Sequence, residues 1–225
     1  MTHVLDHAAW AALTGAHAHL AEVHGAAARY HPDVAAFATL RPGSGARGWA
    51  DLAELAGPGA EVAVAGVDAT PPEGWTVVWS LDGVQMVDAG VSPARDPDAV
   101  HLTATDVPDM LDLVARSEPG PFRKRTVEFG GYLGVRRGGT LIAMAGERVR
   151  PPGWSEISAV CTDPAHRGRG HASRLIRAVA AGIRDRGEVP FLHTAATNTN
   201  AIRLYTALGF EVRRETLFRV LRAPA

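Results

Sequence analysis

The spacing of apolar positions changes along this chain, and each spacing predicts a different element. In residues 1 to about 40 the large apolar and histidine side chains follow one another at steps of three and four, which is the spacing of one helix face. They are Trp10, Leu13, His17, Leu20 and His24. This pattern predicts one or two helices in that segment.

Further along, runs rich in valine and tryptophan predict strands. The runs are Glu61–Val67 and Trp75–Val87, and the dipeptides Pro71-Pro72 and Asp82-Gly83 punctuate them as turns do between strands. The stretch from Arg41 to Gly48 is rich in turn residues and predicts an exposed loop. We therefore expect α/β or α+β organisation in the N-terminal half.

The best candidate for a domain boundary is the polar run Ser92–Asp98, which contains two prolines. Proline lacks a backbone donor and disfavours both helix interiors and central strands. We expect a smaller N-terminal α/β domain over residues 1–98 and a second domain over residues 99–225. No internal repeat of fixed period is visible, and the sequence leaves open whether the first unit is a degenerate copy of the second.

The second unit predicts strands and helices in alternation, and hence an α/β fold with a mixed sheet. The expected elements are a strand at His101–Leu102, a helix entered through Thr105–Pro108, a hairpin over Tyr132–Val149, a strand at Glu156–Thr162, a helix from Ala172 that Gly187 closes, a strand at Phe191–Thr194, a helix at Ala201–Leu208, and a last hairpin of Phe210–Val212 with Leu217–Leu221. The strand Glu156–Thr162 is nearly apolar on both faces, so we expect it to be central.

Composition narrows the class of protein. The chain has 225 residues, of which 46% are hydrophobic and 21% charged, and this predicts a folded protein with a real core. Its formal charge of −1 gives no overall positive field, so nucleic acid is a poor default partner. Cys161 is the single cysteine, which fits a reducing cytoplasm.

Two further patterns bear on location. The first residues lack a basic cluster followed by a long apolar run, so they do not resemble a secretory signal. The most apolar helical stretch, Leu175–Ile183, is interrupted by Arg177 and is far shorter than the roughly 20 residues of a membrane span. We expect a soluble cytoplasmic protein with no membrane partner, and a homodimer is left open.

Candidate chemistry lies in the turn after the expected central strand. Glycines at positions 168 and 170 cost backbone entropy that a simple turn would avoid, and the binding of an anion would explain why they are present. The free amides and the positive dipole end of the following helix converge on one point, and glycine lets a phosphate approach. Arg167 and Arg169 add positive charge.

Three other interpretations of this glycine-rich turn predict different residues around it. A nucleotide P-loop requires a Gly-Lys-Ser/Thr sequence, which is absent. A dinucleotide fingerprint requires a third glycine where Ser173 stands and an acidic residue after the next strand, where His193 and Thr194 lie instead. A glycine turn with solvated arginines stays open for the turn taken alone.

A second motif further along the chain favours the anion-binding interpretation of the turn. Arg167, Gly170 and Ala172 fit Arg-x-x-Gly-x-Ala, and further along the chain comes a run from Asn198 through Tyr205 to Phe210. Its residues are Asn198, Ala201, Ile202, Leu204, Tyr205, Leu208, Gly209 and Phe210. This ordered pair resembles the GNAT superfamily of N-acetyltransferases, over roughly Val100 to Leu221. The sequence of Glu156–Thr162 is similar to the corresponding segment in a bacterial subgroup of predicted acetyltransferases. Proteins of that subgroup have a separate N-terminal half, arranged as in glycine N-acyltransferases.

The resemblance implies a fold, a co-substrate and its contacts. Two parallel strands splay apart, and acetyl-CoA enters the gap; its pyrophosphate lies on the amides from Arg167 to Ser173 and its pantetheine arm pairs with Val160–Thr162. A backbone amide near Val160 polarises the thioester carbonyl, and Asn198 holds the pantetheine arm. The implied contacts are Val160, Cys161, Thr162, Arg167, Gly168, Arg169, Gly170, His171, Ala172, Ser173, Asn198 and Tyr205.

The resemblance also suggests catalytic residues. Tyr205 is the expected general acid, since a phenol can protonate the leaving thiolate; the alternative is a tyrosine that only packs on an amphipathic helix. Glu156 is the first candidate for the base that takes the amine's proton, because burial at a cleft edge would raise its pKa. Glu147 and His193 are alternatives, and each of the three also fits a purely structural role.

We therefore predict an acetyl-CoA-dependent N-acetyltransferase that transfers acetyl directly to an amine of unknown identity. A catalytically silent acyl-CoA-binding module and an NAD-dependent oxidoreductase are the competing functions. No metal is expected, since His17, His19 and His24 have no acidic or cysteine partner. Cys161 is expected to pack as a small apolar residue, and the basic run Arg123–Arg125 either steers an anion or is solvated.

Overall fold

The computed structural model describes residues 3–65 and 70–225, and within them the strands form one mixed sheet. Its eleven strands have the order β1-β2-β3-β4-β11-β5-β10-β9-β8-β7-β6. The strands are β1 (Ala21–His24), β2 (Ala27–Tyr30), β3 (Phe37–Leu40), β4 (Glu61–Val64), β5 (Thr76–Asp88), β6 (Ala99–His101), β7 (Leu133–Arg137), β8 (Thr140–Glu147), β9 (Trp154–Thr162), β10 (Val189–Ala195) and β11 (Phe210–Arg222). Only β3 with β4 and β9 with β10 are parallel pairs among the described strands.

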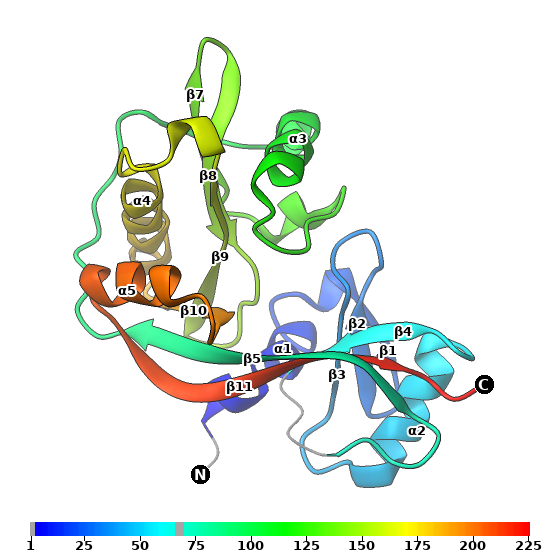
Figure 1. The fold of residues 1–225 in the computed structure, drawn as a ribbon. Coiled ribbons are helices and arrows are strands. Elements are labelled where there is room, and N and C mark those ends of the chain that lie inside the picture. The colour runs from blue at the N-terminus through cyan, green and yellow to red at the C-terminus, as the bar shows by residue number, and fades with distance from the viewer. Residues whose placement is uncertain (1–2, 66–69) are drawn as a thin grey trace.

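The α-helices of the described residues are distributed over two lobes. They are α1 (Ala8–Leu13), α2 (Gly45–Ala56), α3 (Val107–Ser117), α4 (His171–Asp185) and α5 (Thr199–Leu208). The first lobe contains β1–β4 with α1 and α2, and the second contains β6–β10 with α3, α4 and α5 (Figure 1). The long antiparallel pair of β5 and β11, here called the ribbon, runs through both lobes and joins them.

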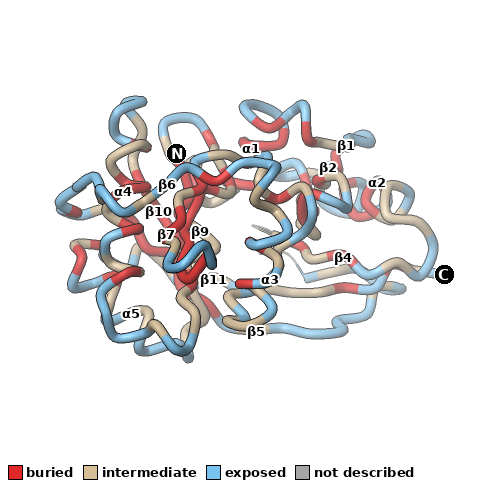
Figure 2. Tube along the Cα trace, turned by 90° about the horizontal axis from the view of Figure 1, so that it is seen from above, coloured by how far each residue is buried: buried red, intermediate tan, exposed pale blue. Residues whose placement is uncertain are grey.

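The second lobe has an apolar layer on each face of its strands. Leu175, Ile176 and Val179 of α4 pack on one face against Ile142 and other β8 and β9 residues. Met110 and Leu113 of α3 pack on the other face, and Figure 1 shows α3 opposite α4. Figure 2 shows the buried residues gathered along the central strands. The prediction that the strand ending at Thr162 is central is confirmed, because β8 and β10 flank it.

The two parallel strands of this lobe separate after a short pairing. β10 pairs with β9 only from Val189 to Phe191, opposite Trp154 to Glu156, although β9 continues to Thr162. On its other side β9 shifts register against β8 between the pairs of Ser158 and Cys161. Ala159, at that shift, has φ of 52°, a left-handed conformation that costs energy for a residue with a Cβ. The predicted splay is confirmed.

The expected helical pattern of the N-terminal segment is wrong beyond α1. The helix ends at Leu13, and the chain continues as strands from Ala21. His17 is buried and its Nδ1 lies 2.9 Å from the Tyr30 hydroxyl, so its spacing reflects a packing contact and not a helix face. Gly25, with φ of 54°, makes the turn between β1 and β2.

Two predicted turns of the ribbon are also wrong. The expected hairpin at the C-terminal end is one strand, β11, with a register shift near Arg213. Asp82 and Gly83 lie inside β5 and make no turn. A Cβ at Gly83 would come within 2.3 Å of Cε2 of Phe218, so this glycine makes room for a ring.

The remaining predicted elements of the second unit fall close to their expected bounds, including the β7–β8 hairpin and the C-terminal glycines of α4 and α5. Of the expected strand 61–67, residues 61–64 form β4, and positions 66 and 67 lie outside the described residues. No helix in the described parts of the chain has the length and apolar character needed to cross a bilayer.

Candidate functional site

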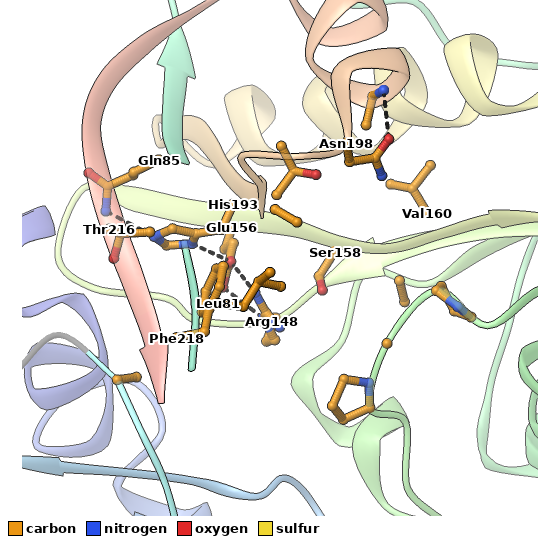
Figure 3. A pocket seen from close by; sticks show the side chains of 18 of the residues that line it. Leu81, Gln85, Arg148, Glu156, Ser158, Val160, His193, Asn198, Thr216 and Phe218 are labelled. Carbon is orange, nitrogen blue, oxygen red and sulfur yellow. Dashed lines mark hydrogen bonds and ion pairs between the residues drawn. The ribbon is translucent and has the colours of Figure 1, made fainter. Parts of the chain in front are cut away.

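The separated ends of β9 and β10 open into a cavity of about 720 Å³, a size typical of small-ligand sites. Its wedge end is lined by β9, α4 and α5 through Val160, Cys161, Thr162, Arg167, Ala172, Asn198, Ala201, Leu204 and Tyr205. Its chamber end is lined by the first lobe and the ribbon through Leu5, Asp6, Ala8, Phe37, Val64, Trp79, Leu81, Gln85, Arg214, Thr216, Phe218 and Val220. Arg148, Glu156, Ser158 and His193 lie between the two ends (Figure 3).

The glycine-rich turn lies at the mouth of the wedge end. Arg167 and Ala172 line the cavity, and Gly168, Arg169 and Gly170 are exposed beside them. The φ angles of Gly168 and Gly170 are 75° and 76°, and a Cβ at either position would meet nothing within 4 Å. The two glycines are therefore required by backbone conformation and not by crowding.

The turn leaves the first amides of α4 open. Within the described residues, no group accepts a hydrogen bond from the backbone amides of Gly168 to Ser173, and the first bond of this helix start runs from the Arg174 amide to the Gly170 carbonyl at 3.1 Å. These amides and the positive end of the α4 dipole make an anion-binding geometry. Burial and the neighbouring Arg174 lower the pKa of the His171 ring, which favours its uncharged form.

Helix α5 brings two predicted residues to the same end. The Oδ1 of Asn198 accepts a hydrogen bond from the Ala201 amide at 3.1 Å and so begins the helix. Its amide nitrogen lies on the side of Val160 in Figure 3. Tyr205 is 9% exposed and its ring packs edge-on against Phe210, with ring centroids 6.2 Å apart. Its hydroxyl has no hydrogen-bond partner among the described residues, and burial raises its pKa.

Glu156 is 1% exposed and is the most constrained acid of the cavity. Burial alone would raise the pKa of this carboxyl, but the charge of Arg148 and the contact with His193 outweigh burial and lower it. Arg148 binds both carboxylate oxygens, with Nε 2.9 Å from Oε2 and Nη2 2.5 Å from Oε1. The expected rise of the Glu156 pKa is therefore wrong, because sequence spacing did not reveal Arg148.

His193 has both ring nitrogens occupied. Nδ1 lies 2.7 Å from Oε1 of Glu156, and Nε2 lies 3.1 Å from the side-chain nitrogen of Gln85 (Figure 3). Arg213 donates to Oε1 of Gln85 at 2.7 Å, so the Gln85 nitrogen faces the histidine as a donor. In this arrangement Nδ1 of His193 carries a proton and donates it in a hydrogen bond to Glu156. Nε2 accepts a hydrogen bond from Gln85.

The other residues singled out from the sequence lie elsewhere. Glu147 does not line the cavity: it accepts a hydrogen bond from Ser155 and pairs with Arg186. Cys161 is buried on β9 within the apolar cluster below α3, although it also borders the cavity. Arg123 donates to the Pro32 carbonyl at 2.9 Å, outside the cavity.

The histidines of the N-terminal segment do not belong to a metal site among the described residues. In residues 3–65 and 70–225 no three His, Cys, Asp or Glu side chains are grouped so as to hold a metal ion. His17 contacts Tyr30 and Phe129, and burial lowers its pKa to about 4. Sequence analysis missed Arg148, Gln85, Trp79 and Phe218, since each stands alone on its own strand with no motif around it.

The splayed strands, the open helix start and the long cavity between them are the architecture of an acyltransferase. Residues 132–219 match the family described as FR47-like protein. A solved structure from Novosphingobium aromaticivorans, assigned to the GNAT family of acetyltransferases, is 42% identical over 100% of both chains, with a TM-score of 0.90. The chain therefore belongs to the GNAT family, as its motifs predicted, and its fold class is confirmed.

Two more distant comparisons agree in fold or in part of the sequence. The GCN5-related N-acetyltransferase of Kribbella flavida has the same fold, with a TM-score of 0.64 and 17% identity over 100% of this chain and 97% of that one. N-alpha-acetyltransferase RimI of Mycobacterium tuberculosis is 39% identical over 83 residues, which are 36% of this chain and 51% of that protein. The chain thus spans about half the length of the curated relatives it matches.

Proposed function

We propose that this protein is an acetyl-CoA-dependent N-acetyltransferase that transfers the acetyl group directly to an amine. The observation that carries this proposal is the row of open amides from Gly168 to Ser173 at the mouth of a cavity that continues between β9 and β10. The diphosphate of coenzyme A is the anion that such a row accepts. Arg167 and Arg169 supply positive charge beside it.

The thioester then lies along β9, with its pantetheine arm beside Val160–Thr162 and Asn198. The acceptor nitrogen attacks the carbonyl carbon, the C–N bond forms, and the C–S bond breaks as electrons return to sulfur. The backbone amide near Val160 stabilises the oxyanion. Tyr205 donates its hydroxyl proton to the thiolate, and the raised pKa of this phenol keeps it protonated until that moment. The nitrogen of the new amide loses its extra proton to water, and the Tyr205 phenolate then takes up a proton from water.

Glu156 enters this proposal as a positioning residue. Its oxygens accept hydrogen bonds from Arg148 and His193, and the Val149 amide lies 3.4 Å from Oε2. With its lone pairs engaged and its pKa lowered, this carboxylate stays ionised and holds Arg148 and His193 in place at the wall of the site. The ammonium proton leaves through water before the attack.

The first lobe shapes the acceptor chamber in this proposal. Leu5, Ala8, Phe37 and Val64 line the cavity and all precede the expected boundary at residue 98. Residues 1–98 would supply part of the acceptor wall, β11 of residues 99–225 the rest, and residues 99–225 also the co-substrate site. The division into domains 1–98 and 99–225 stays a prediction. We also propose a cytoplasmic location, where acetyl-CoA is available; a homodimer stays a prediction.

Substitution of Tyr205 by Phe tests the transferase function. We expect kcat for release of free thiol from acetyl-CoA to fall by about 100-fold, within the usual range for a lost general acid. The dissociation constant of acetyl-CoA, measured by calorimetry, stays unchanged. Thr206→Ala, at an exposed neighbouring position on α5, is the control and keeps full activity.

Two results contradict the proposal in different ways. If the wild-type protein binds acetyl-CoA but acetylates no amine of a broad panel, it is a binding module and not a transferase. If acetyl-CoA does not bind, the assignment of the open amides is wrong.

A further inference from the structure

The chamber end of the cavity is walled by one face of the ribbon. Antiparallel register places Trp79 opposite Val220, Leu81 opposite Phe218, Gly83 opposite Thr216 and Gln85 opposite Arg214. Directly opposed residues of neighbouring strands point to the same side of a sheet. These seven side chains, those of Trp79, Leu81, Gln85, Arg214, Thr216, Phe218 and Val220, line the cavity, and we call them the ribbon face.

The ribbon face changes from polar to apolar along its length. Gln85 and Arg214 mark the polar part, and both belong to hydrogen-bonded networks with Asp6 and Arg213. The apolar part consists of Trp79, Val220, Leu81 and Phe218. A small ligand that lies on this part meets hydrocarbon and aromatic surface, and few polar groups.

Phe218 connects the apolar part to the reacting region. Its ring lies over Gly83, where a Cβ would be 2.3 Å from Cε2, and its centroid is 6.1 Å from that of His193. Figure 3 shows Leu81 and Phe218 beside Glu156 and Arg148. The apolar surface therefore begins next to β9, where the acceptor nitrogen must reach the thioester.

Part of this apolar surface is left uncovered by the protein itself. Trp79 is 49% exposed although it lines a cavity. Covering apolar surface is favourable by about 25 cal/mol per Å², and an exposed apolar wall in a concave site indicates an apolar ligand. Phe37 and Val64 of the first lobe continue this wall.

The two carboxylates nearest the polar part of the ribbon face are already paired. Glu156 is bound by Arg148, and Asp6 is bound by Arg213 and lies 3.2 Å from Arg214. Arg148 also lies over the Phe37 ring, 5.0 Å from its centroid. A second cationic or anionic group on the acceptor would have to break one of these pairs, so the observations favour an acceptor whose body is uncharged.

We propose that the acceptor is a small primary amine with an aromatic or branched aliphatic body, which lies on the apolar part of the ribbon face with its nitrogen directed toward β9. This inference rests on the proposed acetyl transfer and names its acceptor class. Polyamines, polar amino acids and lysine side chains of proteins are poor acceptors under it.

The test compares matched amines and two neighbouring variants. We expect kcat/KM for 2-phenylethylamine and 3-methylbutylamine to exceed that for 1,4-diaminobutane and glycinamide by at least about tenfold. Trp79→Ala lowers kcat/KM for 2-phenylethylamine by about tenfold, through KM and not kcat, while glycinamide is unaffected. Val78→Ala is the control, because Val78 is 42% exposed, alternates to the opposite side of β5 and does not line the cavity.

The outcomes separate this inference from the proposed transfer reaction. Equal rates across the amine panel, or no effect of Trp79→Ala, would overturn the acceptor class and leave the transferase intact. If no amine is acetylated, calorimetric titration of 2-phenylethylamine into the coenzyme A complex decides the matter. Binding that Trp79→Ala weakens and Val78→Ala does not supports the inference, and absence of binding refutes it.

Discussion

The wedge end and the chamber end of the cavity are built from different parts of the chain. At the wedge end, consecutive residues of one turn present their backbone amides. The two residues that matter most there are glycines, which have no side chain. At the chamber end, single side chains from α1, β3, β4, β5 and β11 form the wall. The wedge end is therefore sensitive to backbone conformation, and the chamber end to the size and charge of individual side chains.

The largest expected effect lies where the two ends meet. Glu156→Gln leaves the partly buried Arg148 guanidinium without its charge partner, and we expect the free energy of unfolding to fall by about 3–5 kcal/mol. Denaturant unfolding measures this change. Asp185→Asn, at an exposed pair with Arg95, serves as control and changes stability by less than about 1 kcal/mol. A loss below about 1 kcal/mol for Glu156→Gln would show that this pair does not hold the ends together.

Substitution at the turn separates backbone from side-chain effects. Gly170→Val forces a branched residue into a φ of 76°, and we expect the dissociation constant of acetyl-CoA to rise by about 10- to 100-fold, the equivalent of one or more charge-assisted hydrogen bonds. Gly138→Val imposes similar strain at φ of 56° in the turn between β7 and β8. Calorimetry should find acetyl-CoA binding unchanged in that control, and an equal loss in both would point to general unfolding.

Acid conditions test the Glu156 pair without changing its shape. The pKa of Glu156 is lowered in the folded protein, so the unfolded chain takes up a proton near its ordinary value of 4.5 while the folded one does not. Stability from this group is complete above that pH and decreases as the pH falls toward the lower folded value, by up to about 1.4 kcal/mol per pH unit. In Glu156→Gln this contribution to the acid slope is absent. Identical slopes in the two proteins would contradict the lowered pKa.

The smallest effect is expected for a side chain at the wedge end. Arg169→Gln removes an exposed positive charge, and we expect acetyl-CoA to bind only about two- to fivefold more weakly, because exposed charges are well screened. Raising the ionic strength should remove the difference. A change as large as that of Gly170→Val would show that side-chain charge, and not the amide row, holds the co-substrate.

The contrast between the two ends also explains what sequence could predict. The turn, Asn198 and Tyr205 stand in contiguous motifs, so the resemblance of these motifs to the GNAT superfamily was enough to predict the residues of the wedge end. Glu156 and His193 were both candidates, but their contact requires β9 and β10 to be neighbours, and the lowered pKa depends on Arg148 of the polypeptide between β8 and β9. No local pattern carries that information.

The errors in the fold have the same origin. Gly83 was interpreted as a turn residue, yet its role is to make room for the ring of Phe218, which lies far along the chain on β11. The spacing of His17 fitted a helix face, but its burial comes from Tyr30 across a turn. Predictions failed where a residue's role is set by a distant partner, and the chamber end of the cavity is made of such residues.

The pairing of β11 with β4 has a consequence for how the protein forms. Arg222 contacts Glu61 across a sequence separation of 161 residues, and β11 also completes the ribbon with β5. Contacts this distant close slowly, because a long loop must be ordered first. During synthesis, the glycine-rich turn and α4 emerge before β11, the strand that completes the ribbon. We therefore expect the chamber end of the cavity to form only after β11 has paired with β4 and β5.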